Sequence, residues 1–159
     1  MKDMEKENLA ELARLEKQFA SLYRIASSVC GLPDCTFWVL YFLLSSKEPL
    51  AQQDLIERMR FPKQTINSAV LSLSRTGHVT LAMIPGTRNR KRITLTAQGK
   101  GLARQTVGRL LKAESKAVRL MGDGKMREYI ALHDEFLALL KSEFEEAGLV
   151  AARDAKEGM

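Results

Sequence analysis

The amino-acid sequence predicts a mainly α-helical protein with one small β-hairpin, and three observations support this. Long segments at both ends carry apolar residues at the three-to-four spacing of an amphipathic helix. Shorter helical patterns between them are separated by Pro and Gly residues, which interrupt helices. Two stretches rich in Val, Ile and Thr, residues 78–84 and 91–95, flank a Pro-Gly turn, which is the pattern of a hairpin.

The N-terminal segment is expected to form a helix from about Glu5 to Ser28. One apolar stripe runs along it, made of Leu9, Leu12, Leu15, Phe19, Leu22 and Ile25. Gly31 and Pro33 should end this helix, and Asp34 should cap a second one. The second helix is apolar on nearly all sides, so we expect it to be buried. Residues 47–49 then indicate a loop.

Two shorter helices are expected next, from about Ala51 to Met59 and from Lys63 to about Thr76. Pro62 suits the first helical position of the second, because its missing N–H has no partner there. Gly77 should end it. The predicted buried face of this helix contains Ile66, Ala69, Val70 and Leu73.

The C-terminal part should hold the hairpin and two long helices. The hairpin turn spans residues 85–90. Thr96 can cap a helix that runs to about Met121, and residues 122–124 separate it from the last helix. The last helix carries a heptad-type apolar seam, which suits packing against another helix. The seam consists of Met126, Ile130, His133, Leu137, Leu140 and Phe144.

The charge distribution indicates a segment that binds a polyanion. Residues 58–113 contain no Asp or Glu and hold 12 basic residues. The remaining 13 basic and 19 acidic residues give the rest of the chain a net charge of −6, although the whole chain carries +6. Such a basic segment between acidic flanks is typical of nucleic-acid binding. A merely solvated basic face is the alternative interpretation.

The order of elements in this basic segment is that of a winged helix-turn-helix: a short helix, a turn, a helix with one polar face, and a basic hairpin. Gln64 and Asn67 carry amides that can pair with an adenine edge, and Lys63 suits a phosphate. Arg88 and Arg90 are expected on a hairpin tip that can enter a minor groove. The full set of predicted DNA contacts is Arg58, Arg60, Lys63, Gln64, Thr65, Asn67, Ser68, Ser72, Arg75, Arg88, Arg90, Lys91 and Arg92.

The segment from Phe61 to Gly101 resembles the DNA-binding lobe of the MarR family of bacterial regulators. Residues 93–99, Ile-Thr-Leu-Thr-Ala-Gln-Gly, are similar to the family's strand leading into Leu-Thr-x-x-Gly, and residues 77–79 to its Gly-x-hydrophobic end of the recognition helix. The family's wing usually carries Asp-x-Arg, where this chain has Thr87 and Asn89. The usual Asp-to-Arg brace is therefore missing, and Arg88 or Arg90 is expected to make the groove contact instead.

The resemblance implies a homodimer in which the first and last helices of both chains intertwine. Residues 1–32 and 106–159 would then form a helical dimerisation region, and residues 33–105 the winged helix-turn-helix region. The implied function is sequence-specific regulation of transcription, as a repressor on a pseudo-palindromic double-stranded operator. A small-molecule effector is a further implied partner, and its identity is not encoded in any motif.

Other functions have less support. The chain has no Gly-rich phosphate loop, no metal-ligand spacing of Cys and His, and no nucleophile elbow, so we expect neither an enzyme nor a cofactor nor a metal. A winged-helix adaptor that binds proteins without specific DNA binding is the alternative. The longest apolar run has eight residues, too few to span a bilayer, and no signal peptide is evident, so a cytoplasmic location is expected. Some members of the MarR family sense oxidants through a cysteine, so the resemblance makes a redox switch at Cys30 or Cys35 conceivable, but buried structural thiols are commoner.

Overall fold

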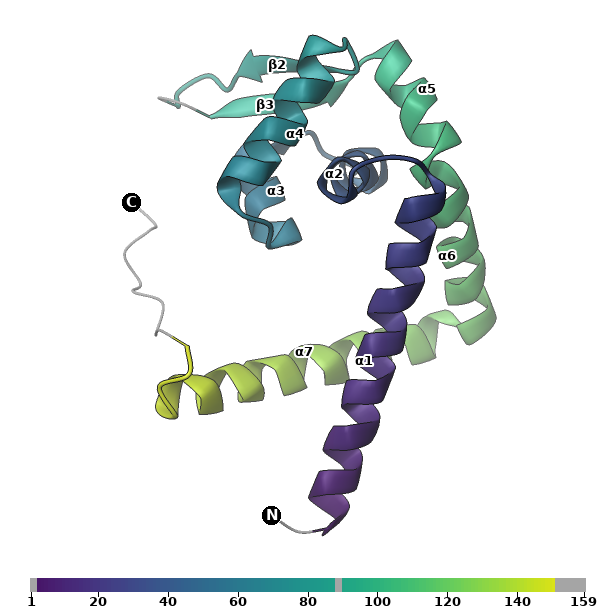
Figure 1. Cartoon of the computed structure of the whole chain (residues 1–159), viewed down its shortest axis with the longest axis vertical. Helices are drawn as coiled ribbons and strands as arrows, with labels where there is room; N and C mark the ends of the chain where they lie inside the picture. Colours follow the sequence, from purple (N-terminus) through teal and green to yellow (C-terminus); the bar gives the residue numbers. More distant parts are fainter. Residues whose placement is uncertain (1–2, 88–89, 151–159) are drawn as a thin grey trace. The chain divides into compact units, whose positions relative to one another are not determined.

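A computed structural model describes residues 3–87 and 90–150 (Figure 1). The elements are α1 (Asp3–Val29), α2 (Asp34–Ser45), β1 (Leu50–Ala51), α3 (Gln52–Met59), α4 (Lys63–Arg75), β2 (Val79–Met83), β3 (Lys91–Leu95), α5 (Ala97–Gln105), α6 (Val107–Met121) and α7 (Asp123–Glu146). The chain divides into two compact units, one up to Ala113 and one from Glu114 onward. The predicted fold class, mainly helical with a small hairpin, is confirmed.

The core of the first unit is built around α2, as its apolar sequence predicts. Phe37, Val39 and Leu40 are completely buried, and α2 contacts α1, α3, α4, α5 and β3. Leu55 from α3 and Ile66 from α4 join them in the same apolar cluster. Each such side chain stabilises the fold by roughly 1.5–3 kcal/mol relative to an exposed one. The core therefore fixes the position of α3 and α4 relative to the sheet.

The start of α4 at Lys63 is confirmed, but the positions predicted for Asp34 and Pro62 at the helix starts were each wrong by one residue. Pro33 occupies the N-cap position of α2, and Asp34 is the first helical residue rather than the cap. Its carboxylate lies in the first turn, where the helix dipole favours negative charge. Pro62 is likewise the N-cap of α4 rather than its first residue, because its ψ of 135° is extended. Its carbonyl accepts hydrogen bonds from Thr65 and Ile66 at 2.9 and 3.2 Å.

The sheet has three strands in the order β1-β3-β2, one more than the sequence predicted. β1 contains two residues, Leu50 and Ala51, which pair antiparallel with Ile93 and Arg92. The sequence predicts a loop at residues 47–49 and a helix from Ala51, but Ala51 is the N-cap of α3. Two residues are too few for an alternating pattern to appear, so periodicity could not reveal this strand.

β2 and β3 form the predicted hairpin, with Val79 opposite Leu95 and Met83 opposite Lys91. The pairing continues beyond the strands, because the Ile84 N–H donates to the Arg90 carbonyl at 2.9 Å. A turn at Pro85-Gly86 starts the connection, and Gly86 takes a φ of +78°, which glycine adopts readily. Figure 1 shows this hairpin extending beyond α4.

The helix predicted from Thr96 to Met121 is two helices. Thr96 is the N-cap of α5 as expected, since its Oγ1 accepts the Gly99 N–H at 3.0 Å. The break lies at Thr106, whose ψ of −83° is not helical and whose hydroxyl donates to the Leu102 carbonyl at 2.7 Å. Threonine hydroxyls that bond to the preceding turn bend or interrupt helices in this way.

Both long terminal helices carry exposed apolar side chains. On α1 these include Leu15, Phe19 and Ile25, and α7 has no buried residue at all. In the described residues, no single helix is both long and apolar enough to cross a membrane. α1 and α2 reach that threshold only when they are taken together across a 95° bend.

Candidate nucleic-acid interface

Helix α4 divides sharply into a buried and an exposed face. Ile66, Ala69, Val70 and Leu73 are buried, which confirms the predicted core face. The other face contains neutral polar and cationic side chains together with one leucine, and no carboxylate. These exposed residues are Lys63, Gln64, Thr65, Asn67, Ser68, Leu71, Ser72 and Arg75. The structure thus brings the predicted residues of this helix together on one solvent-facing surface.

The N-terminus of α4 is open to an anion. Pro62 provides no side-chain hydrogen bond to the first turn, and no acidic residue lies there. Helix N-termini with such unsatisfied N–H groups favour phosphate. Lys63 is exposed in the same turn.

The link between α3 and α4 exposes two of the predicted arginines. Arg58 lies in the last turn of α3, and Arg60 ends that helix in the left-handed conformation, with φ of 55°. The Arg60 N–H donates to the Ile56 carbonyl at 3.3 Å. Both residues are exposed, and neither forms an ion pair with the described residues.

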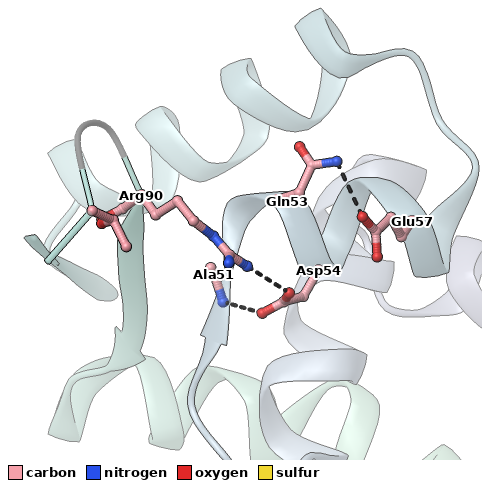
Figure 2. Close-up of polar contacts among 6 residues, drawn as sticks. Ala51, Gln53, Asp54, Glu57 and Arg90 are labelled. Carbon is pink, nitrogen blue, oxygen red and sulfur yellow. Dashed lines mark hydrogen bonds and ion pairs between the residues drawn. The ribbon is translucent and has the colours of Figure 1, made fainter. Parts of the chain in front are cut away.

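Arg90 is tied to α3 by an ion pair. Its Nη2 lies 3.3 Å from Oδ1 of Asp54, and Oδ2 of the same carboxylate accepts the Ala51 N–H at 2.7 Å (Figure 2). One carboxylate therefore caps the start of α3 and holds the base of the wing. The wing has neither the aspartate nor the arginine of Asp-x-Arg, but its Arg90, one residue after the motif, pairs with Asp54, which lies 36 residues earlier in the chain.

Asn67 is also engaged with α3, because the side-chain amide of Gln52 donates a hydrogen bond to its Oδ1. Asn67 is an exposed residue. An asparagine that reads adenine uses both ends of its amide. To read a base, Asn67 would therefore have to exchange its hydrogen bond with Gln52 for one with the base. Neither Gln52 nor Asp54 was predicted as part of the site.

A cavity of about 520 Å³ lies where the wing base meets α3 and α4. Its lining is polar and cationic with one apolar side chain, and consists of Gln52, Gln53, Ile56, Lys63, Asn67, Arg90 and Lys91. This composition favours an anionic group such as a phosphate over an apolar ligand.

The structure separates some of the predicted wing residues. Lys91 lines the cavity, and it shares a face of β3 with the buried Ile93 and Leu95. Arg92 is exposed and, because side chains alternate along a strand, points to the opposite face of the sheet. Arg88, together with Asn89 of the predicted motif position, lies outside the described residues.

Cys35 is buried, whereas Cys30 is partly exposed and its Sγ donates to the Ala26 carbonyl at 3.3 Å. Burial raises the pKa of the Cys35 thiol above its ordinary value, and the negative charge of Asp34 adds to the rise. A raised pKa lowers the thiolate fraction at neutral pH, which disfavours a reactive thiol at position 35. Among the described residues, no group of three His, Cys, Asp or Glu side chains could hold a metal ion.

Comparison with known proteins gives no match at the level of sequence: no family model and no curated protein matches the chain. Solved structures do match it. NMB1585, a MarR family regulator from Neisseria meningitidis, superposes with a TM-score of 0.70 over 86% of this chain and 98% of its own, at 21% identity. The chain has the fold of MarR family regulators.

Two further structures support this fold assignment. MepR from S. aureus in its DNA-binding conformation has a TM-score of 0.67, with 17% identity over 83% of this chain and 98% of MepR. NadR in complex with 4-hydroxyphenylacetate has a TM-score of 0.60, with 18% identity over 82% of this chain and 89% of NadR. The resemblance, which the sequence shows most specifically in residues 61–101, is thus confirmed as a likeness of fold over most of the chain.

Proposed function

We propose that this protein is a sequence-specific, double-stranded DNA-binding regulator of transcription that acts as a homodimer. The observation that carries the proposal is the division of α4, whose buried face locks it to the core while its outer face presents amides, hydroxyls and cations without a carboxylate. A helix of this kind fits the major groove, where amides and hydroxyls read base edges.

Within α4 we assign base reading to Gln64 and Asn67, with Thr65, Ser68 and Ser72 as less selective contacts. Lys63 and the open helix N-terminus would bind a phosphate, as would Arg75 in the last turn. Phosphate contacts fix the register of the helix, and amide contacts then select the bases.

The surroundings of α4 would contact the DNA backbone. Arg58 and Arg60 are exposed just before the helix, and Lys91 lines the cavity beside it. Arg90 could leave Asp54 and bind a phosphate or enter a minor groove, because its side chain is 54% exposed even in the ion pair. Arg88 and Arg92 remain predicted contacts.

A second copy of the chain would cover the apolar faces of α1 and α7. Leu22 on α1 is 66% exposed and Leu137 on α7 is 59% exposed, values that are unfavourable for a helix left in water. A two-fold dimer presents two copies of α4 about 34–36 Å apart, which is one turn of DNA, so the target would be pseudo-palindromic.

The proposal includes repression that a small molecule relieves. It is motivated by NadR, which shares the fold and was solved with 4-hydroxyphenylacetate bound. The chemistry of an effector of this chain stays open. A cytoplasmic location would follow from the DNA target and stays a prediction.

Selection of duplexes from a random pool tests the proposal directly. The purified chain should enrich a two-fold symmetric sequence with half-sites about 10 base pairs apart, and light scattering should give twice the mass of one chain. A protein-interaction adaptor, the alternative function, would enrich no sequence. A monomer that enriches nothing would refute the proposal.

A further inference from the structure

Leu71 lies in the middle of the outer face of α4. It is not one of the residues that the sequence predicts to contact DNA. Its side chain is 46% exposed, and it follows Gln64 and Ser68 and precedes Arg75 at intervals of four, three and four residues. Residues at this spacing share one stripe of a helix. This stripe is opposite the one that carries Ile66, Ala69, Val70 and Leu73, so Leu71 has no place in the core.

An exposed leucine is unusual in this part of the chain. Of the described residues between Cys30 and Ala113, Leu71 and Met83 are the two exposed large apolar side chains. The remaining ones lie on α1, α6, α7 and the residues after α7. Between Cys30 and Ala113 the described large apolar side chains are therefore at least partly buried, except for Met83 at the end of β2 and Leu71 at the centre of the face that is proposed to meet DNA.

We infer that Leu71 is a specificity-determining residue that packs against the 5-methyl group of a thymine in the major groove. The inference rests on the proposed function. Thymine presents a methyl group in the major groove beside hydrogen-bonding groups that leucine cannot satisfy. The absence of Asp and Glu from residues 58–113 argues for a polyanion as the occupant, rather than a second protein. On the same stripe, Gln64 would read a base edge and Arg75 would bind a phosphate.

The test uses deoxyuridine, which differs from thymidine only by the missing 5-methyl group. Each thymine of a duplex selected by the wild-type chain is replaced in turn, and the dissociation constant is measured by fluorescence anisotropy. At one thymine in each half-site, removing the methyl should weaken binding about fourfold, the factor that corresponds to burying one methyl-sized group. This factor should not depend on salt, unlike the contribution of phosphate contacts.

Three variants assign the effect to position 71. Leu71→Ala should bind the thymine and uracil duplexes equally, whereas Leu71→Met, which keeps an apolar side chain of similar reach, should retain most of the difference. Met83→Ala is the matched control, because it removes the other exposed apolar side chain of this part of the chain, and it should keep the full ratio. Circular dichroism should show unchanged folding of Leu71→Ala, because the side chain is exposed.

Each other outcome counts against the inference. Duplex binding that ignores every thymine-to-uracil change, or a methyl effect that persists in Leu71→Ala, would overturn the role of Leu71 and leave the proposed function intact. A Leu71→Ala chain that loses its dimeric mass would indicate a protein contact at this position instead. A wild-type chain that binds no duplex would refute the proposed function and this inference with it.

Discussion

The backbone carbonyl oxygen of His78 lies 1.8 Å from the position that a Cβ atom at Gly99 would occupy. Thr96 holds the two segments together, since its hydroxyl donates to the Gly77 carbonyl at 2.7 Å and its N–H donates to the His78 carbonyl at 3.0 Å. The Leu-Thr-x-x-Gly sequence thus joins the end of α4 to the start of α5 by close backbone contact. Glycine is required at position 99 because any larger residue would place its Cβ against the His78 carbonyl oxygen.

Gly99→Ala should destabilise the fold by about 1–3 kcal/mol, because backbone atoms cannot move aside cheaply. Gly101→Ala in the same helix is the control, since nothing lies within 4 Å of its added Cβ. Alanine is the better helix former, so this variant should gain up to about 1 kcal/mol. Urea denaturation measures both changes. Equal stability of the two variants would contradict the close approach.

Asp54→Asn should raise the affinity for any duplex several-fold. Asparagine can still accept the Ala51 N–H, but Arg90 loses its ion pair and becomes free for phosphate. The pair is exposed, so the fold itself should change by less than about 1 kcal/mol. Salt titration of binding should show a steeper slope for the variant.

Glu57→Gln is the control for this effect. Glu57 lies on the same helix and accepts from Gln53 at 3.2 Å, without contact to Arg90 (Figure 2). Both variants remove one negative charge from the lobe. An equal gain in affinity would mean that net charge alone matters and that Arg90 does not take part.

Asn67→Ala and Gln64→Ala should each reduce specific affinity by about 1–3 kcal/mol, while nonspecific binding changes little. Both side chains are exposed, so thermal stability should be nearly unchanged. Gln52→Ala distinguishes the contact of Asn67 with Gln52 from its proposed contact with a base. The variant removes Gln52 as the hydrogen-bond donor and leaves Asn67 in place. If Asn67→Ala binds specific and scrambled duplexes with wild-type affinities, its assignment is wrong.

Leu137→Glu should convert a dimer into monomers. Leu137 is 59% exposed on the apolar seam of α7, and a carboxylate there would be buried without a partner in an assembly. Ala138→Glu is the control, since position 138 lies on the side of α7 that carries Asp134. Light scattering at micromolar concentration reports the mass. A dimer that survives Leu137→Glu would place the interface elsewhere.

The Cys35 thiol should react slowly with iodoacetamide in the folded chain at neutral pH. Its raised pKa means that folding favours the protonated thiol, so the associated stability is present at neutral pH and is lost as pH rises through the folded pKa. The labelling rate should therefore rise with pH and on unfolding. A Cys30→Ser background isolates the signal. Fast labelling at pH 7 would restore the redox-switch hypothesis.

The spacing of apolar and polar residues predicted the structural features that depend on local sequence. The core face of α4, the cap at Thr96 and the hairpin were all visible in residue spacing, because each depends on neighbours within a few positions. The break at Thr106 was missed, since a hydroxyl that bonds to the preceding turn is also tolerated inside helices.

The features of the site that the sequence did not predict are of two kinds. Some are contacts between residues far apart in the chain, and one is an apolar residue on a polar helix face. Asp54 and Arg90 are separated by 36 residues, and Gln52 and Asn67 by 15, so no spacing rule connects them. Leu71 did carry a signal, because an apolar residue stood in a predicted polar face. It went unused because single exposed leucines are common on protein surfaces.

The outer face of α4, which carries no carboxylate, should make the protein bind one DNA sequence in preference to others. Competition of a labelled selected duplex against its scrambled version, at about 50 and 200 mM salt, tests it most directly. We expect a preference of at least about 1,000-fold for the selected duplex, with affinity for both duplexes falling steeply as salt rises. Equal competition by the two duplexes, or affinity that does not change with salt, would contradict it.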